Sequence, residues 1–436
     1  MKILLLNDFD SGSGSAIAAE RLFSVLRKNN VDAKLGVIKK KTANSEVILL
    51  APKKNLSDHC KLFRFIKRLF RKIESYIHKI EKNRFHTTNA ILHSKNQKTL
   101  IDIDFINSSD YDLIHLHWVN HNMISIEDIA KIKKPVIWTL HDSWPFCGAE
   151  HHPNVIEDDT RFIDGYKKNN KPKTTSGPDI CRKTWERKRK AWKNSKFNFI
   201  APSDFMWKAF SKSALFRDSS SSCVVIPNIV PENIFRALDK NALKELFQIP
   251  TGKKIIGFGA AFGVTDKKSI KGGHLLVEAL KKIDNHSDYF FVVFGNDEHS
   301  LIKQIGLPTF VTGFISNSHI LAAIYNVCDV FVCPSLLENL PNVCLESLFC
   351  GTPVAAFDTG GIPDIVEHKK TGYLAKCFDP EDLYNGILYC IDNYDQLSGN
   401  ALKKMQTEFP NDVIAKKHIE LYESVLKTYS NASKQD

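Results

Sequence analysis

The sequence lacks the marks of several protein classes. None of its ten cysteines forms a Cys-x-x-Cys pair, and several lie inside apolar runs, so we expect reduced core residues and no disulfides. It has no stretch of about 18 consecutive apolar residues, which argues against a membrane-spanning helix. The opening residues MKILLLNDFDSG reach Asp8 after a short apolar run, which is typical of a first strand and not of a signal peptide. We therefore expect a cytoplasmic protein.

Metal-ligating residues are scattered, and they offer a single weak grouping. It consists of Cys147, His151, His152 and Cys181. The spacing of Cys147 and His151 suits a zinc site, but a fourth ligand would have to come from across a polar loop. We expect an ordinary loop here and no bound metal, with zinc as the alternative.

The pattern of apolar segments predicts two domains. At 436 residues, the chain is long enough for two units of roughly 200 residues each. Each half alternates apolar strands with helical patterns, which predicts mostly parallel, doubly wound α/β sheets. The expected strands are 3–7, 112–118, 135–142, 197–203 and 223–228 in the first half, and 253–259, 289–295, 309–314, 329–335 and 352–358 in the second.

The most informative stretch is PSLLENLPNVCLESLFCGTPVAAFDTGGIPD, in which Glu338 and Glu346 lie eight residues apart. A buried strand is expected to end at Pro334, and residues 342–350 have helical spacing. Both carboxylates and the helix N-terminus would then meet at the edge of the sheet where ligands bind. The amides suit a phosphate, and the carboxylates suit sugar or ribose hydroxyls. The turn at residues 359–361 would bring more backbone to the same edge.

This stretch resembles the E-x7-E signature of the retaining glycosyltransferases of family 4, which have the two-domain GT-B fold. The matching elements are a strand ending in Pro-Ser, then E-N-L-P-N-V, L-E-S-L, C-G-T-P-V and T-G-G-I-P-D. The resemblance implies an acceptor-side Rossmann-like domain in residues 1–232 and a nucleotide-sugar-binding Rossmann-like domain in residues 233–411. A helix and tail in residues 412–436 would cross back to the first domain.

The resemblance also implies roles for individual residues. Glu346 would hold the ribose hydroxyls of the nucleotide, and Glu338 would orient the donor sugar. The turn containing Gly12 and Gly14 would lie beside the donor diphosphate or the acceptor. The donor-binding loop after Glu338 comprises Asn339, Leu340, Pro341, Asn342 and Val343.

Two further residues are candidates for catalysis. His141 ends an expected strand in W-T-L-H-D-S-W-P, which is similar to the family's His-Asp segment, whose histidine contacts the donor sugar. Asp142 and Trp144 are weaker candidates there, and a purely structural histidine is the alternative. Lys271 precedes an amphipathic helix, and the resemblance places it on the donor diphosphate, where its charge would offset the leaving anion.

One departure from the family pattern concerns the diphosphate contacts. The family usually has an arginine shortly after the preceding strand, but here Ala260 lies near that place and the loop is longer. Lys267 or Lys268 would be the replacement.

The net charge of +11 is concentrated in the first half. Residues 61–84 contain nine lysines and arginines against Glu74 and Glu81, with apolar residues at helical spacing on one face. Such a helix can lie on an anionic membrane surface, although an ordinary core-facing helix with a solvated basic side fits equally well. No nucleic-acid-binding module is recognisable, so we expect no nucleic-acid partner.

We therefore expect a retaining hexosyltransferase whose catalytic residues are Glu338, His141 and Lys271. It would use a nucleotide-sugar donor, with a UDP-sugar favoured over a GDP-sugar, and a saccharide or polyprenyl-linked saccharide acceptor. The resemblance implies cell-surface polysaccharide synthesis, such as O-antigen or capsule, at the inner face of the plasma membrane, with no metal or other cofactor. The alternatives are a nucleotide-sugar epimerase and a non-catalytic protein that binds membranes or lipid head groups.

Overall fold

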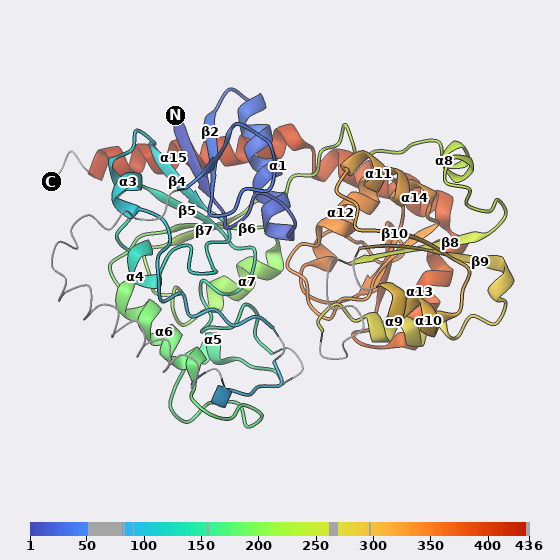
Figure 1. Cartoon of the computed structure of the whole chain (residues 1–436), viewed down its shortest axis with the longest axis horizontal. Coiled ribbons are helices and arrows are strands. Elements are labelled where there is room, and N and C mark those ends of the chain that lie inside the picture. The colour runs from blue at the N-terminus through green and yellow to red at the C-terminus, as the bar shows by residue number, and fades with distance from the viewer. Residues whose placement is uncertain are drawn as a thin grey trace, which may run out of the picture.

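The computed structural model describes residues 1–50, 81, 83–89, 91–154, 157–260, 269–295 and 298–432. Over these residues the chain forms two α/β domains side by side, each built around one parallel sheet (Figure 1). Most of the predicted basic helix at residues 61–84 lies outside the described residues, as do Lys267 and Lys268. None of the helices in the described part is long and apolar enough to span a membrane.

The first domain contains a seven-stranded sheet in the order β3-β2-β1-β4-β5-β6-β7. Its strands are β1 (Lys2–Leu6), β2 (Asp32–Val37), β3 (Val47–Leu49), β4 (Leu113–Leu116), β5 (Val136–Thr139), β6 (Asn198–Ala201) and β7 (Ser222–Val225). Its helices are α1 (Gly14–Lys28), α3 (Ile103–Ser108), α4 (Ile126–Ile129), α5 (Arg161–Asp164), α6 (Ile180–Ala191) and α7 (Asp204–Lys212). The central strands are mostly apolar because helices cover both faces of a parallel sheet.

The second domain contains a six-stranded sheet in the order β10-β9-β8-β11-β12-β13. Its strands are β8 (Lys254–Ala260), β9 (Tyr289–Gly295), β10 (Thr309–Gly313), β11 (Val330–Cys333), β12 (Val354–Phe357) and β13 (Gly372–Ala375). Its helices are α8 (Lys240–Leu246), α9 (Gly273–Leu280), α10 (Glu298–Ile305), α11 (Ser318–Val327), α12 (Asn342–Phe349), α13 (Pro380–Asp392) and α14 (Tyr394–Glu408), with short 3₁₀ turns at His286–Asp288 and Ile362–Asp364.

The last helix, α15 (Asn411–Ala432), returns to the first domain. Figure 1 shows it running along that domain beside α1. Its Tyr422 is fully buried, and the Tyr422 hydroxyl lies 2.8 Å from His115 Nδ1 on β4. This arrangement confirms the predicted crossover helix and the GT-B architecture.

The strand order reverses between β1 and β4 in the first sheet and between β8 and β11 in the second. In open α/β sheets, ligands bind outside the carboxyl ends of the strands at such points. The loops after these strands carry most of the candidate site residues predicted from the sequence. The candidate site therefore lies in the region where the two domains meet.

Candidate functional site

The loop after β11 carries Glu338 and lies against the turn at residues 359–361. The Gly361 amide donates a hydrogen bond to the Glu338 carbonyl at 2.9 Å. Gly360 has a φ of +58°, and a Cβ there would lie 2.1 Å from the same carbonyl oxygen. Only glycine permits this conformation and this approach. The expected backbone-rich edge is therefore present.

Lys271 reaches the same loop from the second domain's own β8–α9 connection. Its Nζ lies 2.6 Å from Glu338 Oε1, which also accepts a hydrogen bond from Ser335 Oγ at 2.8 Å. Gly272 makes the approach possible, because a Cβ there would lie 1.8 Å from the Pro334 carbonyl oxygen. Burial works to lower the pKa of Lys271, but the charge and hydrogen bond of Glu338 outweigh it and raise that pKa. Lys271 is therefore cationic at neutral pH.

Glu346 lies on α12 and is almost wholly enclosed. Arg21 Nη2, on α1 of the first domain, lies 2.6 Å from Glu346 Oε1. The Tyr325 hydroxyl donates to Glu346 Oε2 at 2.9 Å. Both carboxylate oxygens thus have protein partners, with which a nucleotide ribose would compete.

Asn339 ties the Glu338 loop to the first domain. Its Nδ2 donates to the carbonyls of Leu140 at 2.6 Å and His141 at 3.2 Å, while its Oδ1 accepts from Ser203 Oγ at 2.8 Å. All four hydrogen-bonding groups are buried or partly buried. This contact places the end of β5 directly beside the carboxylate loop.

Asn342 makes a second contact with the first domain. Its Nδ2 donates to the Gly14 carbonyl at 3.3 Å, and its Oδ1 accepts from Asn228 Nδ2 at 3.1 Å. The glycine turn and the start of α12 therefore meet. Gly12, with a φ of +88°, shapes the turn before α1.

The remaining loop residues contribute mainly backbone and packing. Leu340 is buried and Pro341 is the N-cap residue of α12. Val343 packs on the core from the first turn of that helix. The loop thus offers backbone groups rather than further polar side chains.

His141 is held in a neutral state beside this loop. Its Nε2 lies 2.8 Å from His117 Nδ1, and the two rings are stacked with centroids 5.1 Å apart. Burial lowers the pKa of His141 to about 4, against a partial opposing effect of Asp142, and it lowers the pKa of His117 well below the usual value. Nδ1 is the ring nitrogen of His141 that this pairing leaves for other contacts.

Asp142 and Trp144 form hydrogen bonds with other residues of the first domain. Asp142 Oδ2 accepts from Trp118 Nε1 at 2.7 Å and from His151 Nδ1 at 2.6 Å. Burial works to raise the pKa of Asp142, but His151 holds it well below its usual range. Trp144 is fully buried and donates to the Ser94 carbonyl, so it supports the core and does not reach the domain interface.

Sequence reasoning missed several residues at this interface. Arg21, Ser203 and Asn228 contact the predicted loop from the first domain, as described above. His152 is mostly buried, which lowers its pKa, and it lies near enough to Glu338 and Lys271 for their charges to act on it. Ser203 ends a recognisable strand, but no local pattern marks Arg21 or Asn228.

The metal-like group suggested by the sequence is not assembled in the structure. His151 is hydrogen-bonded to Asp142 and to Ser94 Oγ at 2.8 Å. Within the described part of the chain, Cys147, His151 and His152 do not join a cluster of potential metal ligands, whereas Cys181 does so with two other residues.

Comparison with known proteins supports the fold and part of the family assignment. Residues 239–407 match the family model described as glycosyl transferases group 1. An uncharacterized glycosyltransferase of Methanocaldococcus jannaschii is 26% identical over 192 residues, which cover 39% of this chain and 49% of that protein. The chain spans about half the length of the curated relatives it matches.

Two solved structures share the whole architecture. HepE of Anabaena, crystallised with UDP and glucose, is 17% identical, with 97% of this chain and 100% of that chain covered and a TM-score of 0.64. WaaG, a glycosyltransferase involved in lipopolysaccharide biosynthesis, is 11% identical, with 96% and 99% covered and a TM-score of 0.60. The second domain of this chain therefore matches the group 1 glycosyl transferase model, and the chain as a whole has the two-domain GT-B fold.

Proposed function

We propose that this protein is a retaining glycosyltransferase of family 4, which moves a sugar from a nucleotide-sugar donor to a saccharide acceptor. The observation that carries the proposal is the pairing of Lys271 with Glu338 beside the N-terminus of α12, where the two domains meet. A cation, a carboxylate and a helix N-terminus that lie together fit a sugar diphosphate. The family match of the second domain supports the same activity.

In the proposed reaction, the donor diphosphate binds Lys271 and the amides at the start of α12. Glu338 orients the donor sugar, and His141 contacts it from the first domain. The bond between the anomeric carbon and the phosphate oxygen breaks, and the acceptor oxygen forms a bond on the same face of the sugar. The departing phosphate takes the acceptor's proton, and the charge of Lys271 stabilises the nucleoside diphosphate that leaves.

The pairing of Lys271 with Glu338 has a consequence for donor binding. The diphosphate would draw Lys271 away from Glu338, which frees a carboxylate oxygen for the hydroxyls of the donor sugar. Glu346 would contact the ribose in the same way, after its contact with Arg21 opens. Donor binding and rearrangement of these ion pairs are therefore one event in this proposal.

We favour a UDP-sugar donor, because HepE, which has the same fold, was crystallised with UDP and glucose. We also favour a role in surface polysaccharide or lipopolysaccharide synthesis, with a polyprenyl-linked saccharide as acceptor. WaaG offers fold-level support for that role. The basic residues 61–84 would bring the protein to the anionic inner face of the plasma membrane.

The decisive experiment measures release of nucleoside diphosphate from UDP-, GDP-, ADP- and dTDP-glucose, with and without a panel of alkyl glycosides as acceptors. We expect release of UDP that depends on the acceptor and is lost in Glu338→Gln. Glu381→Gln, a surface carboxylate of the same domain, serves as the matched control and should remain active. The product formed from an α-linked donor should be α-linked by NMR, and a β-linked product would exclude retention.

The same experiment separates the alternatives. An epimerase would change the donor sugar without an acceptor, and a non-catalytic protein would release no nucleotide from any donor. Sedimentation with phosphatidylglycerol vesicles, and with neutral phosphatidylcholine vesicles as control, tests the membrane role. Equal binding to both vesicles would contradict an electrostatic membrane contact.

A further inference from the structure

A second cluster of buried polar side chains lies in the first domain, outside the proposed donor site. It consists of His93, Glu150 and Cys181, whose potential ligand atoms all lie within 4.8 Å of one another. Glu150 and Cys181 are 1% and 3% exposed, and His93 is partly buried. Imidazole nitrogen, thiolate sulfur and carboxylate oxygen are together the donor set that zinc prefers.

The backbone brings two of these residues together. His93 and Glu150 face each other in an isolated antiparallel bridge. The Ser94 amide donates to the Ala149 carbonyl at 2.7 Å, and the His151 amide donates to the Leu92 carbonyl at 3.0 Å. Residues opposite each other in such a pairing carry neighbouring side chains. The bridge therefore fixes the relative positions of the imidazole and the carboxylate.

His93 is oriented as metal-bound histidines usually are. Its Nδ1 lies 2.6 Å from the Ile91 carbonyl oxygen and donates to it, which leaves the lone pair on Nε2. A backbone carbonyl on the other ring nitrogen is the usual outer partner of a histidine ligand.

The two carboxylate oxygens of Glu150 differ in their partners. Oε1 accepts a hydrogen bond from the Tyr166 hydroxyl. Oε2 is buried and has no partner of good hydrogen-bond geometry among the described residues, and the Cys181 thiol lies close enough to interact with the Glu150 carboxyl group. A buried carboxylate oxygen without a hydrogen-bond donor lowers the stability of the folded protein, and a bound cation would offset that loss.

Cys181 lies in the first turn of α6, a helix of 12 residues whose N-terminus is capped by Asp179. The Cys181 thiol is buried beside the Glu150 carboxyl group. A divalent ion would displace the thiol proton, and the N-terminus of the helix favours the resulting thiolate.

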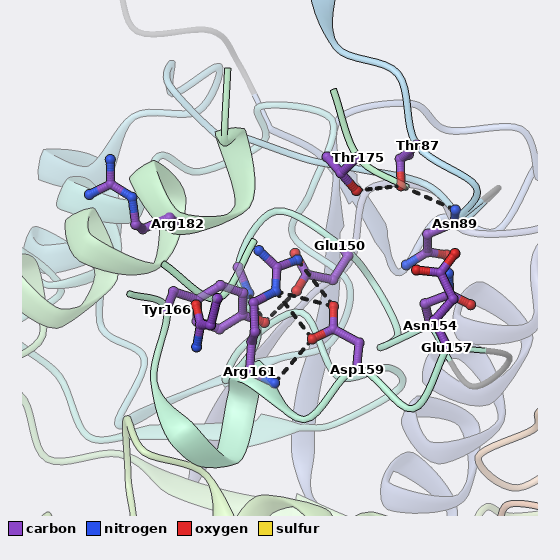
Figure 2. A network of polar contacts seen from close by, with 12 residues as sticks. Thr87, Asn89, Glu150, Asn154, Glu157, Asp159, Arg161, Tyr166, Thr175 and Arg182 are labelled. Atoms are coloured by element: carbon purple, nitrogen blue, oxygen red, sulfur yellow. Dashed lines mark hydrogen bonds and ion pairs between the residues drawn. The ribbon is translucent and has the colours of Figure 1, made fainter. Parts of the chain in front are cut away.

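A small cleft adjoins the cluster and has room for about one water, which can serve as the fourth ligand. Arg161 lines this cleft, and its positive charge is offset by Asp159 at 3.1 Å and Asp179 at 3.4 Å. Figure 2 shows the Arg161 guanidinium between Tyr166 and Asp159, with Glu150 beside them. The arginine makes its ion pairs with these two aspartates, and its charge also acts on Glu150.

We propose that His93 Nε2, Glu150 Oε2 and Cys181 Sγ bind a zinc-type divalent metal ion, with a water in the fourth position. Tetrahedral zinc holds such ligands about 3.5 Å apart, so ligand atoms that lie within 4.8 Å of one another have to approach by at most about 1.3 Å. The ion would join the segment at His93 to α6 and, through Glu150, to the neighbouring His151, which holds Asp142 beside His141.

The test uses the untagged full chain, expressed with added zinc and analysed by mass spectrometry for bound metals. We expect about one zinc per chain, and at least about tenfold less in Cys181→Ser and in His93→Gln. Cys377→Ser, which removes an exposed thiol of the second domain, is the matched control and should keep its zinc. Circular dichroism confirms that each variant is folded.

Replacing zinc with cobalt gives a second readout. A cobalt–thiolate charge-transfer band should appear in the wild-type protein and disappear in Cys181→Ser, while remaining in Cys377→Ser. Wild-type protein without stoichiometric metal would overturn the proposal, as would a Cys181→Ser variant that keeps both its zinc and the cobalt band.

Discussion

Arg21 Nη2 and Glu346 Oε1 lie 2.6 Å apart and form a buried ion pair between the two domains. The side chains are 5% and 4% exposed, and the pair joins α1 of the first domain to α12 of the second. The Arg21 guanidinium also lies 5.2 Å from the centroid of the Phe235 ring. Breaking such a pair by removing one partner is costly because the other charge stays buried.

We predict that Arg21→Ala lowers the free energy of unfolding by about 3–5 kcal/mol, because Glu346 then lacks its cation. Urea denaturation followed by circular dichroism measures the change. Arg27→Ala is the control, since Arg27 lies on the same helix but is 41% exposed and pairs only with surface carboxylates. Its effect should stay within about 1 kcal/mol.

A double variant tests whether the pair acts as a unit. Arg21→Met combined with Glu346→Leu removes both charges and fills the space with apolar atoms. We expect it to be more stable than Arg21→Ala, since no uncompensated charge remains. Strictly additive losses in the double variant would show that the two residues are not coupled.

Donor binding should compete with the same ion pair. If the ribose takes Glu346 from Arg21, free Glu346 is the binding-competent state, and Arg21→Ala should bind UDP more tightly than the wild type. Glu346→Ala should bind UDP more weakly. Isothermal titration calorimetry at a temperature where all variants are folded measures both constants. Unchanged affinity in Glu346→Ala would contradict a ribose role for this residue.

Runs of apolar residues predicted most of the strands, because such runs indicate which segments are buried in the core. All ten strands expected from apolar runs are present, although most are shorter by one or more residues at their ends. The strands β2, β3 and β13 were missed. In β2, Asp32, Lys34 and Gly36 interrupt the apolar pattern, and β13 has only four residues. Pairing with β1 and β12 places these segments in the sheets, and that is a tertiary effect.

The place of Glu338 at the edge of the sheet was predictable for a similar reason, since this residue follows a buried strand and precedes a helix along the chain. Arg21 was not, because its partner Glu346 lies 325 residues away in the other domain. The cluster around Glu150 was missed because His93 reaches it only through a backbone bridge between loops. A contact between segments that are distant in the chain does not change the spacing of apolar residues in either segment, so the sequence pattern does not reveal it.

Lys271 should act mainly on the chemical step. In Lys271→Met the leaving diphosphate loses a preorganised cation, so we expect kcat to fall by about 10²–10³-fold. Lys281→Met, at the exposed C-terminal end of the same α9 helix, is the matched control and should leave kcat unchanged. Steady-state kinetics with the best donor measures both variants. A change confined to KM would assign Lys271 to ground-state binding only.

The buried histidines should make the protein sensitive to acid. His141 and His418 are enclosed, and burial lowers their pKa values to about 4 and about 3. His115 and His117 are also held neutral by burial. In the unfolded chain all four imidazoles regain a pKa near 6.5. Between pH 6.5 and 4 the unfolded state therefore binds more protons than the folded state does.

It follows that the stabilising effect of neutral histidines is complete above about pH 6.5 and is lost progressively as the pH falls towards 4. We predict that each buried imidazole lowers the free energy of unfolding by about 1 kcal/mol per pH unit below that point. Thermal unfolding between pH 7.5 and 5 measures the loss, before most carboxylates titrate.

His418→Leu replaces one buried imidazole on α15 with an apolar side chain, so its unfolding temperature should fall less steeply over this range. His319→Leu is the control, because His319 is an exposed histidine on α11, and its unfolding temperature should change with pH as in the wild type. The same dependence of unfolding temperature on pH in all three proteins would show that the buried histidines do not control the response to acid.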